Sequence, residues 1–195
     1  MDPINIILLI NLVVTMSANA SAAKKGVRIS VLKVTERPES FLQKLPPNIS
    51  ALILILTIVS AFNAFVLPES FKEQFAIWRY IGLALYIIFS WIQVISFKEL
   101  GDSYAQDVVI LKEHKLVSSG IYKYIRHPQY LSQFLSDFGA GIALLSYIII
   151  PLVILIELPL FIMRAFLEEK ILLKHFKENF SEYKKKSRFM IPFIG

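Results

Sequence analysis

The chain has 195 residues, of which 55% are hydrophobic and 18% are charged, and its formal net charge is +6. It contains no cysteine, which excludes disulfides, thiolate nucleophiles and cysteine-ligated metals. The charges stand in blocks between long uncharged runs, so the sequence predicts several membrane spans instead of one soluble core. The expected partners of the positive charge are membrane lipids, with no nucleic acid and no metal.

Five apolar runs predict five transmembrane helices in an all-α integral membrane protein. The first run follows Asp2 instead of a basic segment, which favours a retained span over a cleaved signal peptide. Proline and short polar links mark where the other runs begin and end. In chain order the predicted spans cover residues 4–20, 49–67, 75–97, 131–149 and 151–166.

The cations predict how these spans are oriented. The loop 24–48, the polar segment 98–130 and the C-terminal tail carry nearly all of the 21 Lys and Arg residues. Only Lys72 and Arg79 lie near the other side of the bilayer. The positive-inside rule then places these three segments in the cytoplasm and the N-terminus outside. Residues 1–195 are expected to form a single domain, with 1–97 as scaffold and 98–195 holding the functional segment, a helical hairpin and a tail helix.

Two polar stretches are the candidates for a functional site. The first, residues 114–130, reads HKLVSSGIYKYIRHPQY, and the second, residues 164–169, reads RAFLEE at the end of the last apolar run. Gly101 is expected to end the third helix as its C′ residue, and Gly120 to allow a tight turn. Pro128 suits the first turn of the fourth helix, whose backbone N–H groups favour an anion.

This pattern resembles the isoprenylcysteine carboxyl methyltransferase family, within a wider group that includes the phospholipid methyltransferases. The resemblance rests on HKLVSSGIYKYIRHPQY, the hydrophobic hairpin that follows it, and then Arg164, Glu168-Glu169, Phe176 and Glu182-Tyr183. It covers about residues 100–192. Two positions depart from the family pattern, because Ser132 and Lys177 stand where many members have glycine.

The resemblance implies a membrane enzyme that uses S-adenosylmethionine, with its cofactor pocket facing the cytoplasm. The acceptor that it implies is a lipophilic small molecule or a prenylated peptide, and Arg164 is the implied catalytic and substrate-facing residue. The residues implied to bind the cofactor are His114, Lys115, Leu116, Val117, Tyr122, His127, Pro128, Gln129, Tyr130 and Glu168.

The residues themselves are compatible with such a ligand, which needs an apolar slot, an acidic group and cations or amides. Glu157, Arg164 and Glu168 are spaced by seven and four residues, so a continuous helix places them on one face. Charges at membrane depth usually face a polar cavity or each other, and Asp137 is a further candidate. Glu169 is expected to be solvated.

Each of these residues also has a structural interpretation. His127 could cap a helix, and His114 could lie in a loop and contribute only backbone. Arg126 could bind a lipid phosphate, and Arg164 with Glu168 could form an ordinary helical ion pair. Asp137 and Glu157 could pair only with each other, and the lysines 184–186 are expected to meet anionic headgroups.

The chemistry distinguishes the possible acceptors. A carboxylate is already ionised at neutral pH and needs a cation and alignment but no base, so the favoured reaction is methylation of a prenylcysteine-like carboxylate. A phospholipid amine must first lose a proton, for which Glu157 or Asp137 is the candidate base. A non-catalytic lipid-binding or scaffold protein and a nicotinamide-dependent reductase are the alternatives from other classes, and the reductase lacks a second basic cluster for a dinucleotide phosphate.

Overall fold

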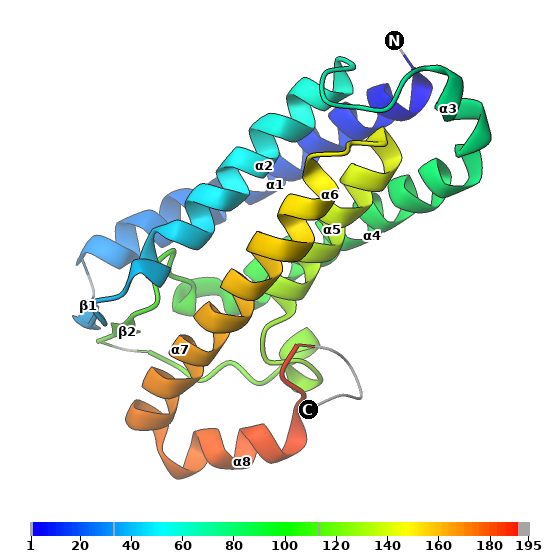
Figure 1. Ribbon diagram of the computed structural model, residues 1–195. Helices are drawn as coiled ribbons and strands as arrows, with labels where there is room; N and C mark the ends of the chain where they lie inside the picture. The colour runs from blue at the N-terminus through cyan, green and yellow to red at the C-terminus, as the bar shows by residue number, and fades with distance from the viewer. Residues whose placement is uncertain (1, 33, 113, 191–195) are drawn as a thin grey trace.

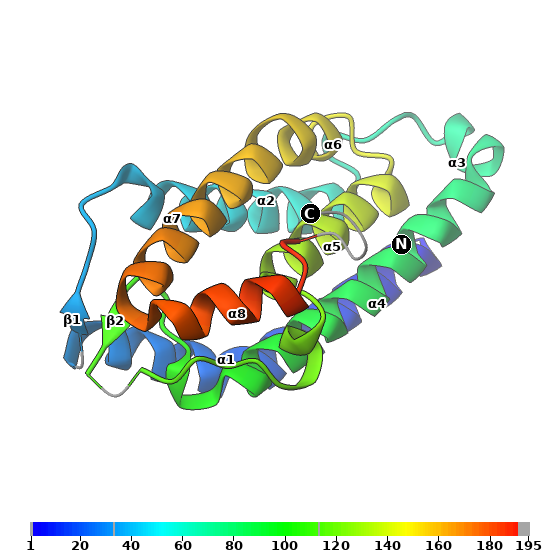
Figure 2. The same ribbon diagram turned by 90° about the horizontal axis from the view of Figure 1, so that it is seen from below.

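The computed structural model describes residues 2–32, 34–112 and 114–190, and this part of the chain is mostly helical (Figure 1). Long helices pack side by side, and a short tail helix turns back beneath them (Figure 2). The elements are α1 (Pro3–Leu32), β1 (Val34–Glu36), η1 (Phe41–Gln43), α2 (Leu45–Ala61), α3 (Ser70–Gln74), α4 (Ala76–Leu100), η2 (Gly101–Ser103), β2 (Ile110–Leu111), η3 (Gly120–Lys123), α5 (Pro128–Leu144), α6 (Ile149–Leu152), the π-helical η4 (Val153–Glu157), α7 (Leu158–Phe176) and α8 (Glu178–Lys186).

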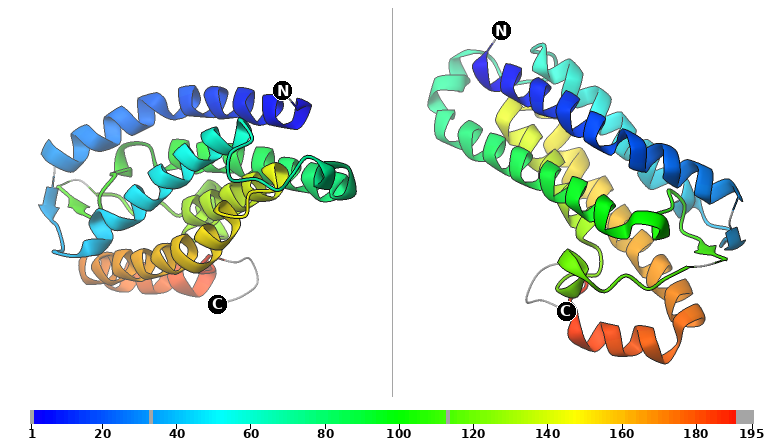
Figure 3. Two further views of the ribbon diagram at one scale, coloured as in Figure 1. Left: turned by 45° about the horizontal axis from the view of Figure 1, so that its top comes forward. Right: turned by 180° about the vertical axis from the view of Figure 1, so that it is seen from behind.

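The bundle presents an apolar outer surface. Within the described residues, four helical segments are long and apolar enough to span a membrane: Pro3–Ala20, Phe41–Ala61, Ala76–Leu100 and Ile149–Phe176. Large side chains on them point outward, as at Ile77 (74% exposed) and Leu155 (68%). The remaining long helix, α5, has 17 residues and contacts α1, α2, α4 and α7 (Figure 3). It therefore forms the centre of the bundle.

Two glycines set the distance between α4 and α5. A Cβ atom on Gly82 would lie 2.6 Å from the backbone nitrogen of Ala143, and one on Gly139 would lie 2.6 Å from that of Tyr86. Contacts this short do not occur, so the two helices approach as closely as backbone allows. Small residues at helix crossings are typical of membrane bundles, which lack a hydrophobic force between helices.

Several predicted helix ends were wrong. Helix α1 continues to Leu32, so the predicted basic loop 24–48 is helical in its first part. Helix α2 begins at Leu45 with prolines in its first turn, and it ends at Ala61 instead of Leu67. The chain beyond Ala61 pairs with the α5–α6 turn, where the Leu67 N–H donates to the Leu145 carbonyl at 3.0 Å.

The polar segment between α4 and α5 contains only short elements, as predicted. Gly101 ends α4 with φ of 50°, and Gly120 adopts φ of 53°, which confirms both as left-handed positions. The strand β2 lies before His114 and pairs antiparallel with β1. This two-stranded sheet joins the polar segment to the end of α1.

The last apolar helix is longer than predicted. Helices α6, η4 and α7 run on from Ile149 to Phe176, so Glu168 and Glu169 lie inside a helix instead of opening a tail. The chain then bends sharply at Lys177, whose φ and ψ are 48° and −117°, and α8 returns toward the bundle. These angles favour glycine, because a side chain there clashes with its own backbone.

Replacing Lys177 by glycine is therefore expected to stabilise the protein by about 1 kcal/mol, since it relieves this backbone strain. The measurement is thermal unfolding in detergent, where the expected rise is about 2–4 °C for a chain of this size. Lys170→Gly, at an exposed position inside α7, is the matched control and is expected to lower stability by a similar amount. A drop in stability for Lys177→Gly would contradict the observed bend.

Candidate active site

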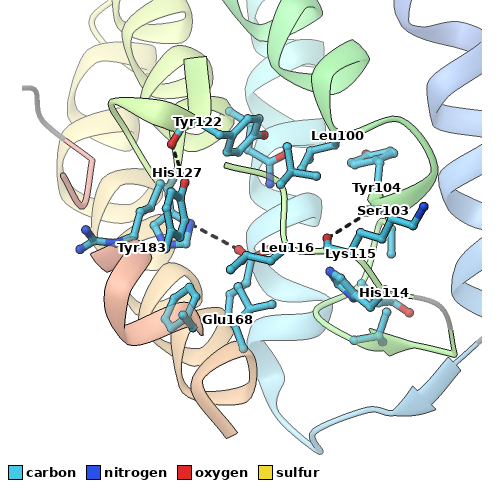
Figure 4. Close-up of a pocket in the computed structure, with 18 residues that line it drawn as sticks. Leu100, Ser103, Tyr104, His114, Lys115, Leu116, Tyr122, His127, Glu168 and Tyr183 are labelled. Carbon is cyan, nitrogen blue, oxygen red and sulfur yellow. Dashed lines mark hydrogen bonds and ion pairs between the residues drawn. The ribbon is translucent and has the colours of Figure 1, made fainter. Parts of the chain in front are cut away.

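An outer cavity lies between the polar segment, the ends of α4 and α7, and helix α8. Two walls face each other across it in Figure 4, with Tyr122, His127, Tyr183 and Glu168 on one side and Leu100, Tyr104 and Ser103 on the other. Its described lining residues include Leu100, Ser103, Tyr104, Ala105, Asp107, Val109, His114, Lys115, Leu116, Val117, Tyr122, Arg126, His127, Gln129, Glu168, Leu172, Phe180 and Tyr183. The cavity is thus partly apolar and partly lined by titratable groups.

His127 is the centre of a buried polar cluster at the start of α5. Its Nδ1 lies 3.5 Å from Glu168 Oε2, and its Nε2 lies 3.4 Å from Glu169 Oε1. Burial lowers the pKa of His127, but the hydrogen bonds and charges of the two glutamates outweigh it and raise the pKa above its usual value. Protonated His127 is therefore favoured between two carboxylates.

Glu169 is not solvated, which corrects the expectation from the sequence. Its side chain is 6% exposed and accepts from Arg126 Nε at 2.6 Å and from Lys184 Nζ at 2.6 Å. Arg126 also donates to the carbonyls of Lys184 and Ser187. These contacts fix α8 against the start of α5, so Arg126 and Glu169 act mainly in holding the site together.

The C-terminal segment 187–190 completes this wall. Ile125 and Arg188 form a parallel bridge, and the N–H groups of Arg126 and His127 donate to the carbonyls of Arg188 and Phe189. The Phe189 ring lies edge-on to the His127 ring, with 5.2 Å between their centres. Tyr183 adds a hydrogen bond from its hydroxyl to the Tyr122 carbonyl at 2.6 Å. The tail thereby shields His127 from solvent.

The raised pKa of His127 predicts a pH-dependent stability. Because the pKa of His127 is higher in the folded state, protonation of His127 stabilises the fold. This stabilisation is complete below the unfolded-state pKa of about 6.5, and it is lost as the pH rises through the folded-state pKa. The melting temperature of the wild type should therefore exceed that of His127→Gln most at about pH 5.5 and least at about pH 9. His175→Gln, at an exposed position on α7, is the matched control. A His127→Gln difference that stays constant with pH would contradict the ion pairs.

A second, inner cavity adjoins the first on the side of the helices. The two share Tyr104, Ala105, Asp107, Gln129 and Glu168 as lining residues. The inner cavity is also lined by Pro46, Pro47, Ser50, Gln93, Phe97, Gln106, Val108, Tyr130, Gln133, Phe161 and Arg164, from α2, α4, α5, α7 and the polar segment. A ligand in the outer cavity and a second ligand among the helices would thus meet at a common wall.

Arg164 is buried in the inner cavity and already has several acceptors. Its Nε donates to the Tyr130 hydroxyl at 3.1 Å, its Nη1 to the carbonyls of Leu42 and Gln43, and its Nη2 to that of Gln106. A guanidinium has five N–H donors, so one remains for a ligand in this arrangement. A bidentate grip on a carboxylate requires one of the loop carbonyls to move away.

Tyr130 connects the two cavities. Its hydroxyl donates to Glu168 Oε2 at 3.1 Å and accepts from Arg164. The sequence stretch 114–130 and residues 164–168 of α7 are thus joined through one hydroxyl. Arg164 and Glu168 line the same cavity, and Glu157 accepts from Ser50, which also lines it.

The structure gathers most of the sequence-predicted cofactor residues around the outer cavity. Pro128 is fully buried and lines neither cavity, and Tyr130 lines only the inner one. The residues that meet at the outer cavity are His114, Lys115, Leu116, Val117, Tyr122, His127, Gln129 and Glu168. Sequence reasoning missed Ser103 and Tyr104, which no motif marks, and it quoted Tyr183 only as part of the resemblance.

One buried polar atom at the common wall is placed where it could bind a ligand. The Gln129 side-chain oxygen is buried and has no hydrogen-bond partner within the described residues. In addition, no side chain among the described residues caps the start of α5, which leaves backbone N–H groups there for an anion. With the carboxylate of Glu168 nearby, the wall presents both a negative and a positive end. Such a set fits a zwitterionic small molecule with a polar body.

The sequence pattern of the phospholipid methyltransferases matches residues 78–179, just over half of the chain. The chain belongs to the phospholipid methyltransferase family. This finding confirms the wider group that the motif resembled. The matched range contains α4, the polar segment, α5 and α7, which are the elements that build both cavities.

Several relatives of this family member are named protein-S-isoprenylcysteine O-methyltransferase. A protein-S-isoprenylcysteine O-methyltransferase of Saccharomyces cerevisiae is 34% identical over 116 residues, which are 58% of this chain and 48% of that protein. A probable protein-S-isoprenylcysteine O-methyltransferase of Oryza sativa subsp. indica is 29% identical over 134 residues, 68% of this chain and 69% of that protein. The chain spans less than half the length of the first curated relatives that it matches, with 48%, 29% and 35%.

The fold has a counterpart among solved structures. A eukaryotic intramembrane Ras methyltransferase, an isoprenylcysteine carboxyl methyltransferase, superposes with a TM-score of 0.62 and 22% identity, covering all of this chain and 69% of that one. This likeness and the apolar helices show that the protein is an integral membrane protein with an all-α fold.

Proposed function

We propose that this protein transfers a methyl group from S-adenosylmethionine to a lipophilic acceptor in the membrane, most simply the carboxylate of a prenylcysteine-like molecule. The observation that carries the proposal is the common wall of the two cavities. A methyl donor in the outer cavity and an acceptor between the helices would meet at Gln129, Glu168 and Tyr104. The protein names of its relatives support this choice of acceptor.

The outer cavity has the groups that such a donor requires. Leu116, Val117 and Tyr122 supply apolar and aromatic surface for a base, and Glu168 supplies an acceptor for hydroxyl or ammonium groups. The uncapped start of α5 suits the carboxylate of the donor. When bound, S-adenosylmethionine supplies an electrophilic methyl group on a sulfonium.

The chain's own residues have a positioning role in this reaction. An ionised carboxylate holds no proton to lose, so its methylation by a bound donor would need no general base, only a cation and alignment. Arg164 holds the Tyr130 hydroxyl and the loop around Gln106, and its remaining N–H can hold one acceptor oxygen. Alignment and exclusion of water are thus the contributions that these residues make.

Amine methylation is less well supported by the arrangement. An ammonium must lose a proton before it attacks, and Asp137 or Glu157 would have to accept it. Both are buried, at 9% and 1% exposure, and neither belongs to the described lining of the two cavities. This position favours a carboxylate acceptor.

The first test is calorimetric binding of S-adenosylhomocysteine to purified protein in detergent, with NADPH as the control ligand. Saturable binding of S-adenosylhomocysteine alone is expected, whereas binding of NADPH alone would overturn the proposal in favour of a reductase. The second test uses labelled S-adenosylmethionine with S-farnesylcysteine or phosphatidylethanolamine. A methyl ester releases methanol in alkali and an N-methyl product does not, so the released label identifies the acceptor atom.

A further inference from the structure

A part of the inner cavity that the outer cavity does not share is lined by polar side chains, although it lies between membrane helices. Gln133 comes four residues after Gln129 on α5, which places it about 6 Å deeper along the helix. Gln93 on α4 and Ser50 on α2 line the cavity beside it. Three polar side chains from three helices thus meet where a lipid tail would require an apolar wall.

A chain of hydrogen bonds holds these side chains in place. Gln93 Nε2 donates to Gln133 Oε1, and Gln133 Nε2 donates to Asp137 Oδ2 at 2.5 Å. On the other side, the Ser50 hydroxyl donates to Glu157 Oε1 at 2.9 Å. One series of bonds thus runs from α4 into α5, and a second bond joins α2 to η4, so four segments of the bundle contribute.

Gln93, Gln133 and Ser50 form a polar floor, and two acidic side chains lie behind it. Asp137 accepts from Gln133 and Glu157 accepts from Ser50, and both acids are buried, at 9% and 1% exposure. Glu157 stands at the end of the π-helical turn η4, and such turns occur frequently at functional sites.

The floor that results can hydrogen-bond to a neutral group. Each glutamine donates one N–H in these hydrogen bonds. The other N–H of each and the Gln93 side-chain oxygen have no partner among the described residues. The described residues that line the floor contain no cation, and the acids behind it repel a second anion. An all-hydrocarbon tail would leave the amides without partners at membrane depth, which is unfavourable.

We propose that Gln93 and Gln133 form a specificity-determining subsite that binds a neutral hydroxyl, carbonyl or amide group on the acceptor, about one helical turn from the methylated oxygen. This inference rests on the proposed function, because it assigns the inner cavity to the acceptor. It adds that the preferred acceptor differs from a plain S-alkylcysteine by a polar group in its chain.

The test compares matched pairs of acceptors on the intact protein saturated with S-adenosylhomocysteine. The probes are N-acetyl-S-(ω-hydroxyalkyl)-L-cysteines with chains of roughly four to ten carbons and their unsubstituted alkyl parents, which bracket a one-turn distance. At the best chain length, calorimetry should show the hydroxyalkyl compound binding about tenfold or more tightly than its parent. This readout requires binding only, so it does not depend on turnover.

Substitutions of Gln93 and Gln133 then test whether these residues cause the preference for the hydroxyalkyl compound. In Gln133→Leu and Gln93→Leu the ratio between the paired probes should fall to about one or below, because the amide partner is lost. Phe97→Leu, an apolar change in the same cavity, should keep the wild-type ratio. Retained S-adenosylhomocysteine binding shows that each variant is folded.

Two results would overturn the inference. One is that the alkyl parents bind as well as the hydroxyalkyl compounds at every length, or that no probe binds, while S-adenosylhomocysteine still binds. The other is a preference that survives in both leucine variants. Loss of S-adenosylhomocysteine binding by the wild type would instead refute the proposed function, so the two failures are distinguishable.

Discussion

Replacing Arg164 by alanine is expected to reduce methyl transfer by at least about 100-fold and to destabilise the protein by about 3 kcal/mol. The variant removes the donor to Tyr130 and leaves the carbonyls of Leu42, Gln43 and Gln106 without this partner. Binding of S-adenosylhomocysteine should fall by less than about tenfold, because Arg164 does not line the outer cavity. Turnover, calorimetry and thermal unfolding measure the three effects.

Two further variants sharpen this experiment. Arg164→Lys keeps the charge but cannot reach several carbonyls at once, so most of the loss should persist. Lys170→Ala removes a cation from an exposed position of the same helix and should behave as wild type. Wild-type turnover in Arg164→Ala would show that the assignment of this residue is wrong.

Replacing Glu168 by alanine is expected to weaken S-adenosylhomocysteine binding by about 10- to 100-fold. The carboxylate lines the common wall, accepts from Tyr130 and pairs with His127, so its loss removes a charged acceptor and frees two partners. A hydrogen bond to a charged group contributes about 1.5–3 kcal/mol, which corresponds to this loss of affinity.

Calorimetry checks this second prediction, with Glu178→Ala as the matched control. Glu178 is an exposed carboxylate at the start of α8, and its removal should leave the affinity unchanged. Glu168→Gln keeps the size of the side chain and should retain part of the binding. Equal affinities in Glu168→Ala and Glu178→Ala would remove Glu168 from the binding site.

The sequence predicted those parts of the fold that depend on local chemistry. Pro128 does begin α5, and Gly101 and Gly120 do adopt positive φ, because these preferences lie within single residues. The end of α2 was misplaced because the chain after Ala61 pairs with Leu145, some eighty residues further on. Such pairings leave no mark on the local sequence.

The same distinction applies to the candidate site. His127 and Glu168 stand in a motif, and the structure brings them within 3.5 Å of each other. Glu169 looked like a solvated helix residue because its partners, Arg126 and Lys184, come from distant segments. Gln93 is a single amide in an apolar run, and only the approach of α4 to α5 places it beside Gln133.

The bridge between residues 187–190 and the start of α5 has a consequence for biogenesis. These residues follow every long helix that the structure describes, so the ribosome adds them after those helices. The wall around His127 can therefore close only after the helices of the bundle have been synthesised. A nascent chain halted before Ser187 would insert its helices but leave His127 open to water, and the membrane would hold an assembled scaffold without a finished site.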